Sequence, residues 1–245
     1  MANFILTPGQ DIITGTSGDD VFFANQGSLN SGDQLNGGGG FDIFDLSVAG
    51  GVNNFSAFQL NGIERFQTFV ASGATANIDL SGSNNVAQIV ARFTAGQLNF
   101  TNADIEVNDL FAIDTVASSN LFVQYGAGET AGTADQANLF VDNAGLNILG
   151  VGLGGVETLN ITAVDGSTTI GQINSAHVNY NLSGTGNIAI LTDLNPSVMS
   201  IDATGLDGNL VVSFSSSAND VTVIGAAGNN TIVAGSGDNT ITAFD

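Results

Sequence analysis

The chain has 245 residues, of which 43% are hydrophobic and only 10% charged, and it contains 33 glycines but 2 prolines. This composition excludes a disordered chain and favours a β protein with many tight turns. The net charge of −21 argues against nucleic acid and anionic membranes as partners. There is no cysteine, and hence no disulfide framework, and no apolar run is long enough to predict a membrane span.

The first 45 residues contain nine-residue segments in which glycine, aspartate and an apolar residue recur at fixed positions. Residues 37–45 fit the pattern G-G-x-G-x-D-x-U-x (U, apolar) at every specified position, and residues 6–14, 15–23 and 28–36 keep part of it. Glycine permits positive φ and leaves carbonyl oxygens uncovered, while aspartate adds a charged oxygen of the kind that Ca²⁺ prefers. The pattern predicts calcium-binding turns, each followed by a short strand whose apolar residue points inward.

Two successive turns lie on opposite sides of a flattened spiral, so one calcium site needs turns n and n+2. The segment Ala24–Gly27 interrupts the nonapeptides. If it bulges out as a loop, the first aspartate falls beside the third and the second beside the fourth. We therefore expect two Ca²⁺ sites, with carbonyl ligands near Gly18 and Gly40 and with four carboxylate ligands, namely Asp11, Asp20, Asp33 and Asp42. The alternative is that such turns serve a coiled parallel sheet without binding metal.

Beyond residue 45 the strict nonapeptides stop, but short runs rich in Val, Ile, Leu, Phe and Thr continue between Gly, Asn and Ser. These runs predict many short strands, whereas only Val86–Leu98 is compatible with a short helix. The predicted strands are 65–71, 76–80, 88–93, 97–100, 105–113, 121–125, 138–142, 146–149, 157–164, 177–182, 187–191, 199–202, 210–215, 221–224, 230–234 and 240–244.

Internal repetition also favours a solenoid. Residues 61–66 recur as residues 154–159, shifted by 93, and residues 80–87 recur as 182–189, shifted by 102. The two shifts differ by one nonapeptide, as expected for two arms of one coiled unit, although chance similarity between low-complexity β segments is the alternative.

The C-terminal segments 225–233 and 234–242 return to the opening rhythm, with Asn230 and Asn239 in place of the ligand aspartates. An amide oxygen can bind Ca²⁺ but brings no charge, so we expect either a metal-free edge or the first turns of a longer array. Because Asp245 falls inside a repeat, we expect a longer parent protein. The expected organisation is calcium-binding turns over 1–45, an irregular parallel β-helix over 46–220 and degenerate turns over 221–245.

Catalytic groups are scarce. The chain has one histidine, two tyrosines and two arginines, which leaves neither a Ser-His-Asp constellation nor a zinc site. We expect His177 to be a surface or ladder residue, and Arg65 either to pair locally with Glu64 or to be a strand-edge charge. We predict no enzymatic activity and no catalytic residues.

The chain resembles the RTX-type (hemolysin-type calcium-binding) surface-layer proteins of Gram-negative bacteria. The nonapeptides over 6–23 and 28–45 carry the resemblance, and so does Gly155–Ile161, which is similar to a recurrent G-V-E-T-x-N-I segment. Residues 200–208 followed by 221–228 are similar to a D-A-S-G-L-x-G … V-T-G-G-A-G-N-D passage. The resemblance implies a right-handed parallel β-helix, Ca²⁺ in its turns, type I export without an N-terminal signal and a lattice of identical copies on the cell surface.

We therefore expect an all-β, right-handed parallel β-helix or β-roll solenoid with calcium-binding nonapeptide turns. Coils of about 18 residues would give roughly 13 coils and a rod of roughly 60 Å. The expected function is that of a secreted, extracellular surface-layer (S-layer) component whose partners are other copies of itself and cell-surface polysaccharide. The alternatives are an adhesion or ice-binding module, or a non-catalytic repeat module of an extracellular polysaccharide-modifying enzyme.

Overall fold

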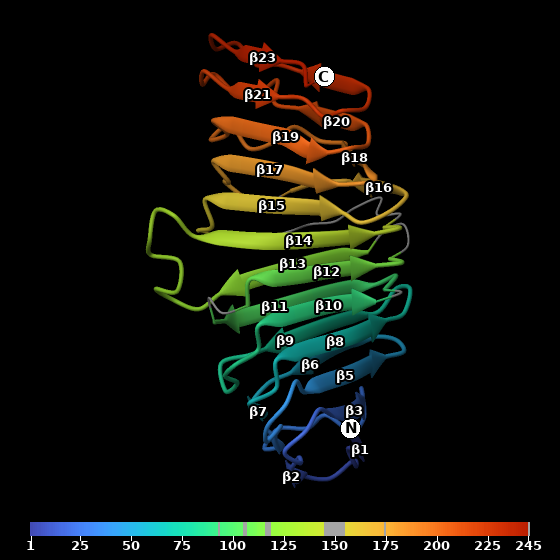
Figure 1. The fold of residues 1–245 in the computed structure, drawn as a ribbon. Coiled ribbons are helices and arrows are strands. Elements are labelled where there is room, and N and C mark those ends of the chain that lie inside the picture. The colour runs from blue at the N-terminus through green and yellow to red at the C-terminus, as the bar shows by residue number, and fades with distance from the viewer. Residues whose placement is uncertain (93, 105–106, 116–118, 145–154, 174, 245) are drawn as a thin grey trace.

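In a computed structural model, the chain winds into one elongated parallel β-solenoid with its termini at opposite ends (Figure 1). The structure describes residues 1–92, 94–104, 107–115, 119–144, 155–173 and 175–244. The strand predicted at 146–149 lies outside the described residues, as does the first residue of the predicted repeat at 154–159. The prediction of an all-β solenoid is confirmed.

One sheet of twelve strands runs the length of the solenoid, and all of its neighbouring strands pair in parallel. In spatial order its strands are β1 (Ala2–Ile5), β3 (Asp20–Asn25), β5 (Ile43–Val48), β8 (Arg65–Val70), β10 (Gln88–Arg92), β12 (Asp109–Ile113), β14 (Gln136–Asp142), β15 (Thr158–Ala163), β17 (Asn179–Gly184), β19 (Ser200–Leu206), β21 (Thr222–Ile224) and β23 (Thr240–Thr242).

Three shorter parallel sheets supply the other strands of the coils. The first contains β2 (Ile12–Thr14), β4 (Gln34–Asn36) and β7 (Gln59–Asn61). The second contains β6 (Val52–Phe55), β9 (Thr75–Asp79), β11 (Gln97–Ala103) and β13 (Asn120–Tyr125). The third contains β16 (Ser167–Ile170), β18 (Asn187–Ile190), β20 (Leu210–Ser213) and β22 (Asn230–Val233).

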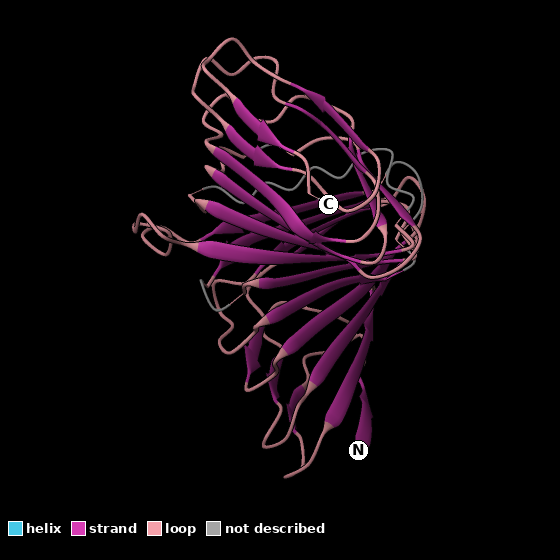
Figure 2. Ribbon diagram, turned by 45° about the horizontal axis from the view of Figure 1, so that its top comes forward, coloured by secondary structure: helices cyan, strands magenta, loops and turns pink. Residues whose placement is uncertain are grey.

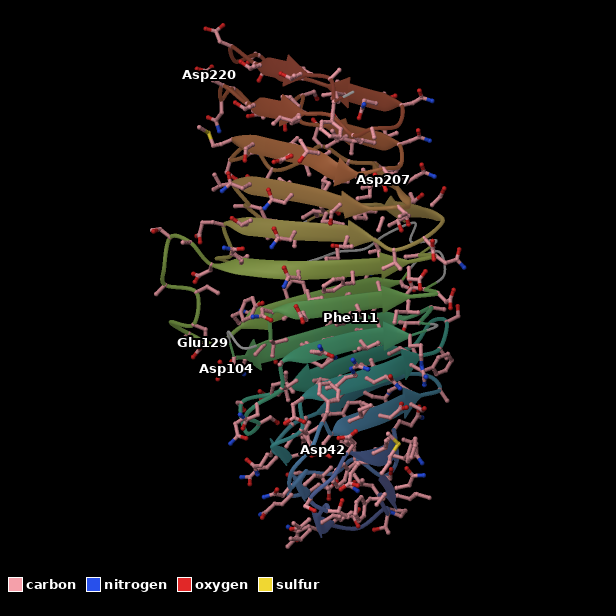
Figure 3. All side chains as sticks on the ribbon, viewed as in Figure 1. Asp42, Asp104, Phe111, Glu129, Asp207 and Asp220 are labelled. Carbon is pink, nitrogen blue, oxygen red and sulfur yellow. The ribbon has the colours of Figure 1, made fainter. Side chains whose placement is uncertain are left out.

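Coil length differs from the expected 18 residues. Ala2 pairs with Asp20 and Thr222 with Thr240, so the first and last coils do have 18 residues. Most coils between them have 21 to 23, and Asp109 pairs with Asn138, 29 residues on. That longest coil contains residues 126–135, which project from the solenoid and carry Glu129 (Figures 1 and 3). The regular 18-residue coil was therefore wrong for the middle, because the loops between strands there are longer than a nonapeptide turn.

Alternation along the strands puts every second side chain inside. An aromatic column starts the core: Phe4 stacks on Phe22, with ring centroids 4.9 Å apart, and Phe44 and Phe66 follow in register, in edge contact at 5.0 Å. Phe100, from β11 of another sheet, meets Phe66 edge-on at 5.1 Å. Aliphatic residues continue the column in register, as Ile89, Leu110, Leu139, Ile161 and Leu182. All of these except Phe4 are buried, so one continuous core joins the coils.

Outside, amide side chains form ladders from coil to coil. Asn138 donates to Asp109, Asn160 to Asn138 and Asn181 to Asn160, at 2.8, 2.9 and 2.7 Å. A second ladder joins Asn54, Asn77 and Asn99 at 2.8 Å per step. The inner amides of these rows (Asn138, Asn160 and Asn77) both donate and accept, which ties the outer face of one coil to that of the next.

The helix considered at Val86–Leu98 does not form. Residues 88–92 are the strand β10, and β11 begins at Gln97. Strand β10 pairs with β8 on one side and β12 on the other, whereas a helix here would leave the facing backbone groups of those two strands without partners. Figure 2 accordingly shows only strands and loops in the described part of the chain, where we also find no helix long and apolar enough to cross a membrane.

Candidate calcium sites

The register of the N-terminal coils places the four predicted aspartates in two pairs. The backbone N–H of Asp11 donates to Asp33 Oδ1 at 2.8 Å, and that of Asp20 donates to Asp42 Oδ1 at 2.7 Å. Asp20, Asp33 and Asp42 are fully buried, whereas Asp11 is half-buried. Both pairs are 22 residues apart, so the structure brings together the partners that the sequence pattern joins.

The interrupting segment Ala24–Gly27 achieves this spacing differently from the expected bulge. Ala24 and Asn25 extend β3 and pair with Leu46 and Ser47 of β5, and only the following residues turn. Half of the insertion is therefore absorbed as added strand, whose backbone hydrogen bonds stay paired.

In three of the four turns, the second carboxylate oxygen accepts a hydrogen bond from a backbone N–H three or four residues earlier in the same turn. Asp11 Oδ2 accepts from the N–H of Thr7 at 2.8 Å, Asp33 Oδ2 from Asn30 at 2.7 Å and Asp20 Oδ2 from Thr16 at 2.5 Å. Asp42 differs, because its buried Oδ2 has no hydrogen-bond partner. The N–H of Gly38, which holds the equivalent place, donates to Asn36 instead.

Glycine is required where these oxygens meet. A β-carbon at Gly37 would lie 1.9 Å from the carbonyl oxygen of Gly62 and 2.3 Å from Asp42 Oδ2. A β-carbon at Gly15 would lie 2.2 Å from the carbonyl oxygen of Gly37 and 2.7 Å from Asp20 Oδ2. In both places a carboxylate oxygen and a glycine carbonyl of the next coil converge. Hard oxygens of these two kinds are the donors that Ca²⁺ takes, so the residues present fit the ion.

The two glycines expected to contribute carbonyls lie in neighbouring coils. Gly40 has φ of 112° and packs on the preceding turn, so that a β-carbon there would lie 2.5 Å from the N of Asp19. The carbonyl oxygen of Gly18 accepts a hydrogen bond from Thr16 Oγ1 at 3.2 Å. Asp19, which the pattern left unassigned, accepts from the N–H of Phe41 at 2.9 Å and so joins the same two turns.

The pKa shifts of Asp20 and Asp42 have opposite directions. Hydrogen bonding from the Thr16 N–H lowers the pKa of Asp20 despite its burial. Burial raises the pKa of Asp42, and the nearby carboxylates of Glu64, Asp20 and Asp19 raise it further. Negative charge is therefore concentrated around Asp42. A divalent cation there would offset both the desolvation cost of the buried carboxylate and the repulsion from its neighbours.

Glu64 is the residue that the nonapeptide pattern missed. Its Oε2 accepts from the N–H of Asp42 at 2.7 Å, so it occupies the place in the next coil that Asp42 occupies relative to Asp20. The sequence signal was the spacing of 22 residues combined with the G-x-D and G-x-E triplets that end at residues 42 and 64.

In the C-terminal turns, asparagine side chains donate hydrogen bonds to the carbonyl oxygens of their own turns. Asn230 Nδ2 donates to the carbonyls of Ala226 and Gly228 at 2.9 and 3.0 Å, and Asn239 Nδ2 to those of Gly235 and Gly237 at 3.0 and 2.9 Å. The amide N–H groups thus bind the carbonyl oxygens that a cation would need in the same turn.

Side chains alone do not assemble a metal centre in the described part of the chain, where no three His, Cys, Asp or Glu residues cluster as ligands. A cation site among these residues therefore needs other oxygen ligands as well, such as the backbone carbonyls of Gly37 and Gly62.

The structure contradicts the surface position expected for His177 and, of the two alternatives for Arg65, the ion pair with Glu64. His177 is fully buried rather than on the surface, and its Nδ1 bonds the Val156 carbonyl at 2.6 Å. Arg65 donates to Gln88 Oε1 at 2.7 and 2.9 Å and lies over the ring of Phe41. Among the described residues, no ion pair joins Arg65 to Glu64. Because coils stack, the partners of His177 and Arg65 come from adjacent coils (Val156 and Gln88) and not from residues next to them in sequence.

A parallel β-solenoid with carboxylates and glycine carbonyls converging between coils has the architecture of a calcium-binding β-roll. Comparison with known families agrees: residues 6–28 and 217–245 match the RTX calcium-binding nonapeptide repeat (4 copies). These segments are RTX repeats, and Ca²⁺ is the ion that such repeats bind. No curated protein and no solved structure matches the chain.

Proposed function

We propose that the chain is a calcium-stabilised structural segment of a secreted bacterial surface-layer protein, and that it assembles with copies of itself into a cell-surface lattice. The RTX repeats and the solenoid make it a structural repeat module of the kind that typically occurs in extracellular proteins. The observation that carries the proposal is the stacking of buried Asp20 on buried Asp42, one coil apart, beside glycine carbonyls.

The proposed side-chain ligands are Asp11, Asp20, Asp33 and Asp42, with carbonyl oxygens in the turns of Gly18 and Gly40. Bound Ca²⁺ would supply the positive charge that these acidic turns lack. The chain's own part is to hold the carboxylates one coil apart, which only the folded solenoid does. Calcium therefore binds the folded chain in preference to the unfolded one and stabilises it.

Coupling of folding to calcium binding would keep the chain unfolded before export and fold it outside the cell. Extracellular sites have dissociation constants of about 10⁻⁴ to 10⁻³ M, so they are largely empty at cytosolic calcium and fill outside the cell. Without the ion, the net charge of −21 opposes compaction. The unfolded chain would be favoured before export and the stacked solenoid after it.

The test compares thermal unfolding of the chain in calcium and in chelator, followed by electron microscopy of the protein in both conditions. We expect a higher melting temperature and an ordered lattice only with calcium. An unchanged melting temperature would remove calcium from the proposal, whereas stabilisation without any lattice would remove the surface-layer role.

Adhesion is the second candidate, because the ladder Asp109–Asn138–Asn160–Asn181 lines up polar groups on the outer face of the long sheet. A flat row of amides is suited to hydrogen-bonding a regular surface such as a polysaccharide. Binding of the chain to purified cell-surface polysaccharide, lost on replacing Asn160 with Leu, would favour it.

A further inference from the structure

Only two carboxylate oxygens among the described residues are buried without a hydrogen-bond partner, Asp42 Oδ2 and Asp135 Oδ2. They are 93 residues apart, which is the shift that relates segment 61–66 to segment 154–159 in the sequence. The second lies at the end of the projecting loop of residues 126–135, outside both segments that match the RTX repeat.

The two aspartates have equivalent partners, each a glutamate in the next coil. The N–H of Asp42 donates to Glu64 Oε2 at 2.7 Å, and the N–H of Asp135 donates to Glu157 Oε2 at 3.0 Å, in each case 22 residues on. The backbone around them also agrees, because the carbonyls of Glu64 and Glu157 each accept two N–H groups of the following coil. Each pair is thus one acidic residue stacked on another, directly before strands of the long sheet.

Oxygen atoms converge beside the first pair, and the corresponding residues beside the second pair are also in close contact with each other. At the first, the carbonyl of Gly62 and Asp42 Oδ2 meet in the space that a side chain at Gly37 would fill. At the second, Thr130 takes the place of Gly37 and Gly155 that of Gly62, and a β-carbon at Gly155 would lie 2.2 Å from Thr130 Oγ1. Gly62 and Gly155 both have positive φ, 58° and 85°, so the two turns share this backbone feature.

Positive charge from the protein does not balance the first pair. The Arg65 guanidinium, next in sequence to Glu64, bonds Gln88 and lies over aromatic rings. A fully buried carboxylate with a free oxygen, stacked on a second carboxylate, is costly unless a cation joins them.

We propose that Asp42 and Glu64 bind a divalent, oxygen-preferring cation such as Ca²⁺ between their coils, and that Asp135 and Glu157 form a second site of the same construction. Glu64 and Glu157 are the new ligands. The inference rests on the proposed calcium binding for the first site, but it is independent of surface-layer assembly. It extends calcium binding beyond the nonapeptides into the middle of the solenoid.

The experiment counts calcium ions bound per chain by equilibrium dialysis and measures their affinity by calorimetry. Glu64→Gln and Glu157→Gln keep an oxygen that can accept the aspartate N–H but remove the charge. Asp207→Asn, at an exposed turn, is the control for the change in net charge. We expect each Gln variant to lose one ion, or to weaken one site at least tenfold, while the control binds as the wild type does.

Equal stoichiometry and affinity in the Gln variants and the control would overturn the inference and leave the glutamates as hydrogen-bond acceptors only. Asp11→Asn separates the two proposals: calcium lost there but not in the Gln variants contradicts only this inference. A wild-type chain that binds no calcium contradicts the proposed nonapeptide sites as well. Should a Gln variant not fold, a crystal of the wild type in calcium decides, since an anomalous peak is expected at both pairs and its absence at both overturns the proposal.

Discussion

The backbone N–H of Asp20 donates to the Oδ1 of Asp42, 22 residues further on, at 2.7 Å. The same bond joins Ala2 to Asp20 on one side and Asp42 to Glu64 on the other, both at 2.7 Å. Carboxylates therefore stack at the spacing of the coils, about 4.8 Å. The hydrogen bonds from backbone N–H groups align these carboxylates, and a cation bound between them would offset their mutual repulsion.

Removing a stacked carboxylate should reduce stabilisation by calcium. We expect the rise in melting temperature on adding Ca²⁺ to be smaller in Asp20→Asn than in the wild type, because the amide keeps the oxygen but not the charge. At calcium ten times the dissociation constant, one site contributes about 1.4 kcal/mol. Calorimetric melting with and without calcium measures this, with Asp207→Asn as the charge-matched control; a full calcium response in Asp20→Asn would contradict it.

A methyl group at Gly37 should disrupt the junction of coils. Gly37→Ala would place a β-carbon 1.9 Å from the Gly62 carbonyl, so the coils must separate. We expect a loss of about 1–3 kcal/mol or more in the free energy of unfolding, together with weaker calcium binding. Gly50→Ala is the matched control, because nothing lies within 4 Å of a β-carbon there. Urea unfolding of both variants would contradict the prediction if they were equally stable.

The aromatic column should dominate core stability near the N-terminal end. Phe66 is fully buried between Phe44 and Phe100, so Phe66→Ala leaves a cavity and should cost about 3–5 kcal/mol. Phe122 on β13 faces outward with 36% exposure, and its replacement by Ala should cost less than about 1 kcal/mol. Comparable urea midpoints for the two variants would rule out this account of the core.

Acid should destabilise the solenoid through His177. Burial lowers the pKa of its imidazole below the usual 6.5, while Nδ1 donates to Val156 and the buried Nε2 has no partner. The unfolded chain binds a proton as the pH falls below 6.5, and the folded chain does so only at lower pH. Stability from this group is therefore full above 6.5 and declines as the pH falls through that value.

His177→Asn can still donate to the Val156 carbonyl but cannot titrate, so it should lack this component of the pH dependence. Urea unfolding of both proteins on either side of pH 6.5 gives the comparison. The same decline in both would assign the acid sensitivity to other groups, such as the carboxylates.

Sequence reasoning reached the class of fold and the pairing of the N-terminal aspartates. Glycine, aspartate and an inward apolar residue at fixed positions describe a turn and a strand almost completely, because the constraints are local. The insertion at Ala24–Gly27 set the 22-residue spacing, and the 93-residue shift marked a real repeat of Asp42 and Glu64 in Asp135 and Glu157.

The rest required the tertiary structure. Whether residues 88–92 form a strand, whether His177 is buried and whether Glu64 lies beneath Asp42 all depend on how many residues each coil contains. Local preferences do not set that number, since loops of different lengths can close equally well. The sequence alone determined that this chain coils and predicted which turns are candidates for binding calcium. The stacking of neighbouring coils decided which side chains meet, because contacts between coils join residues some twenty positions apart.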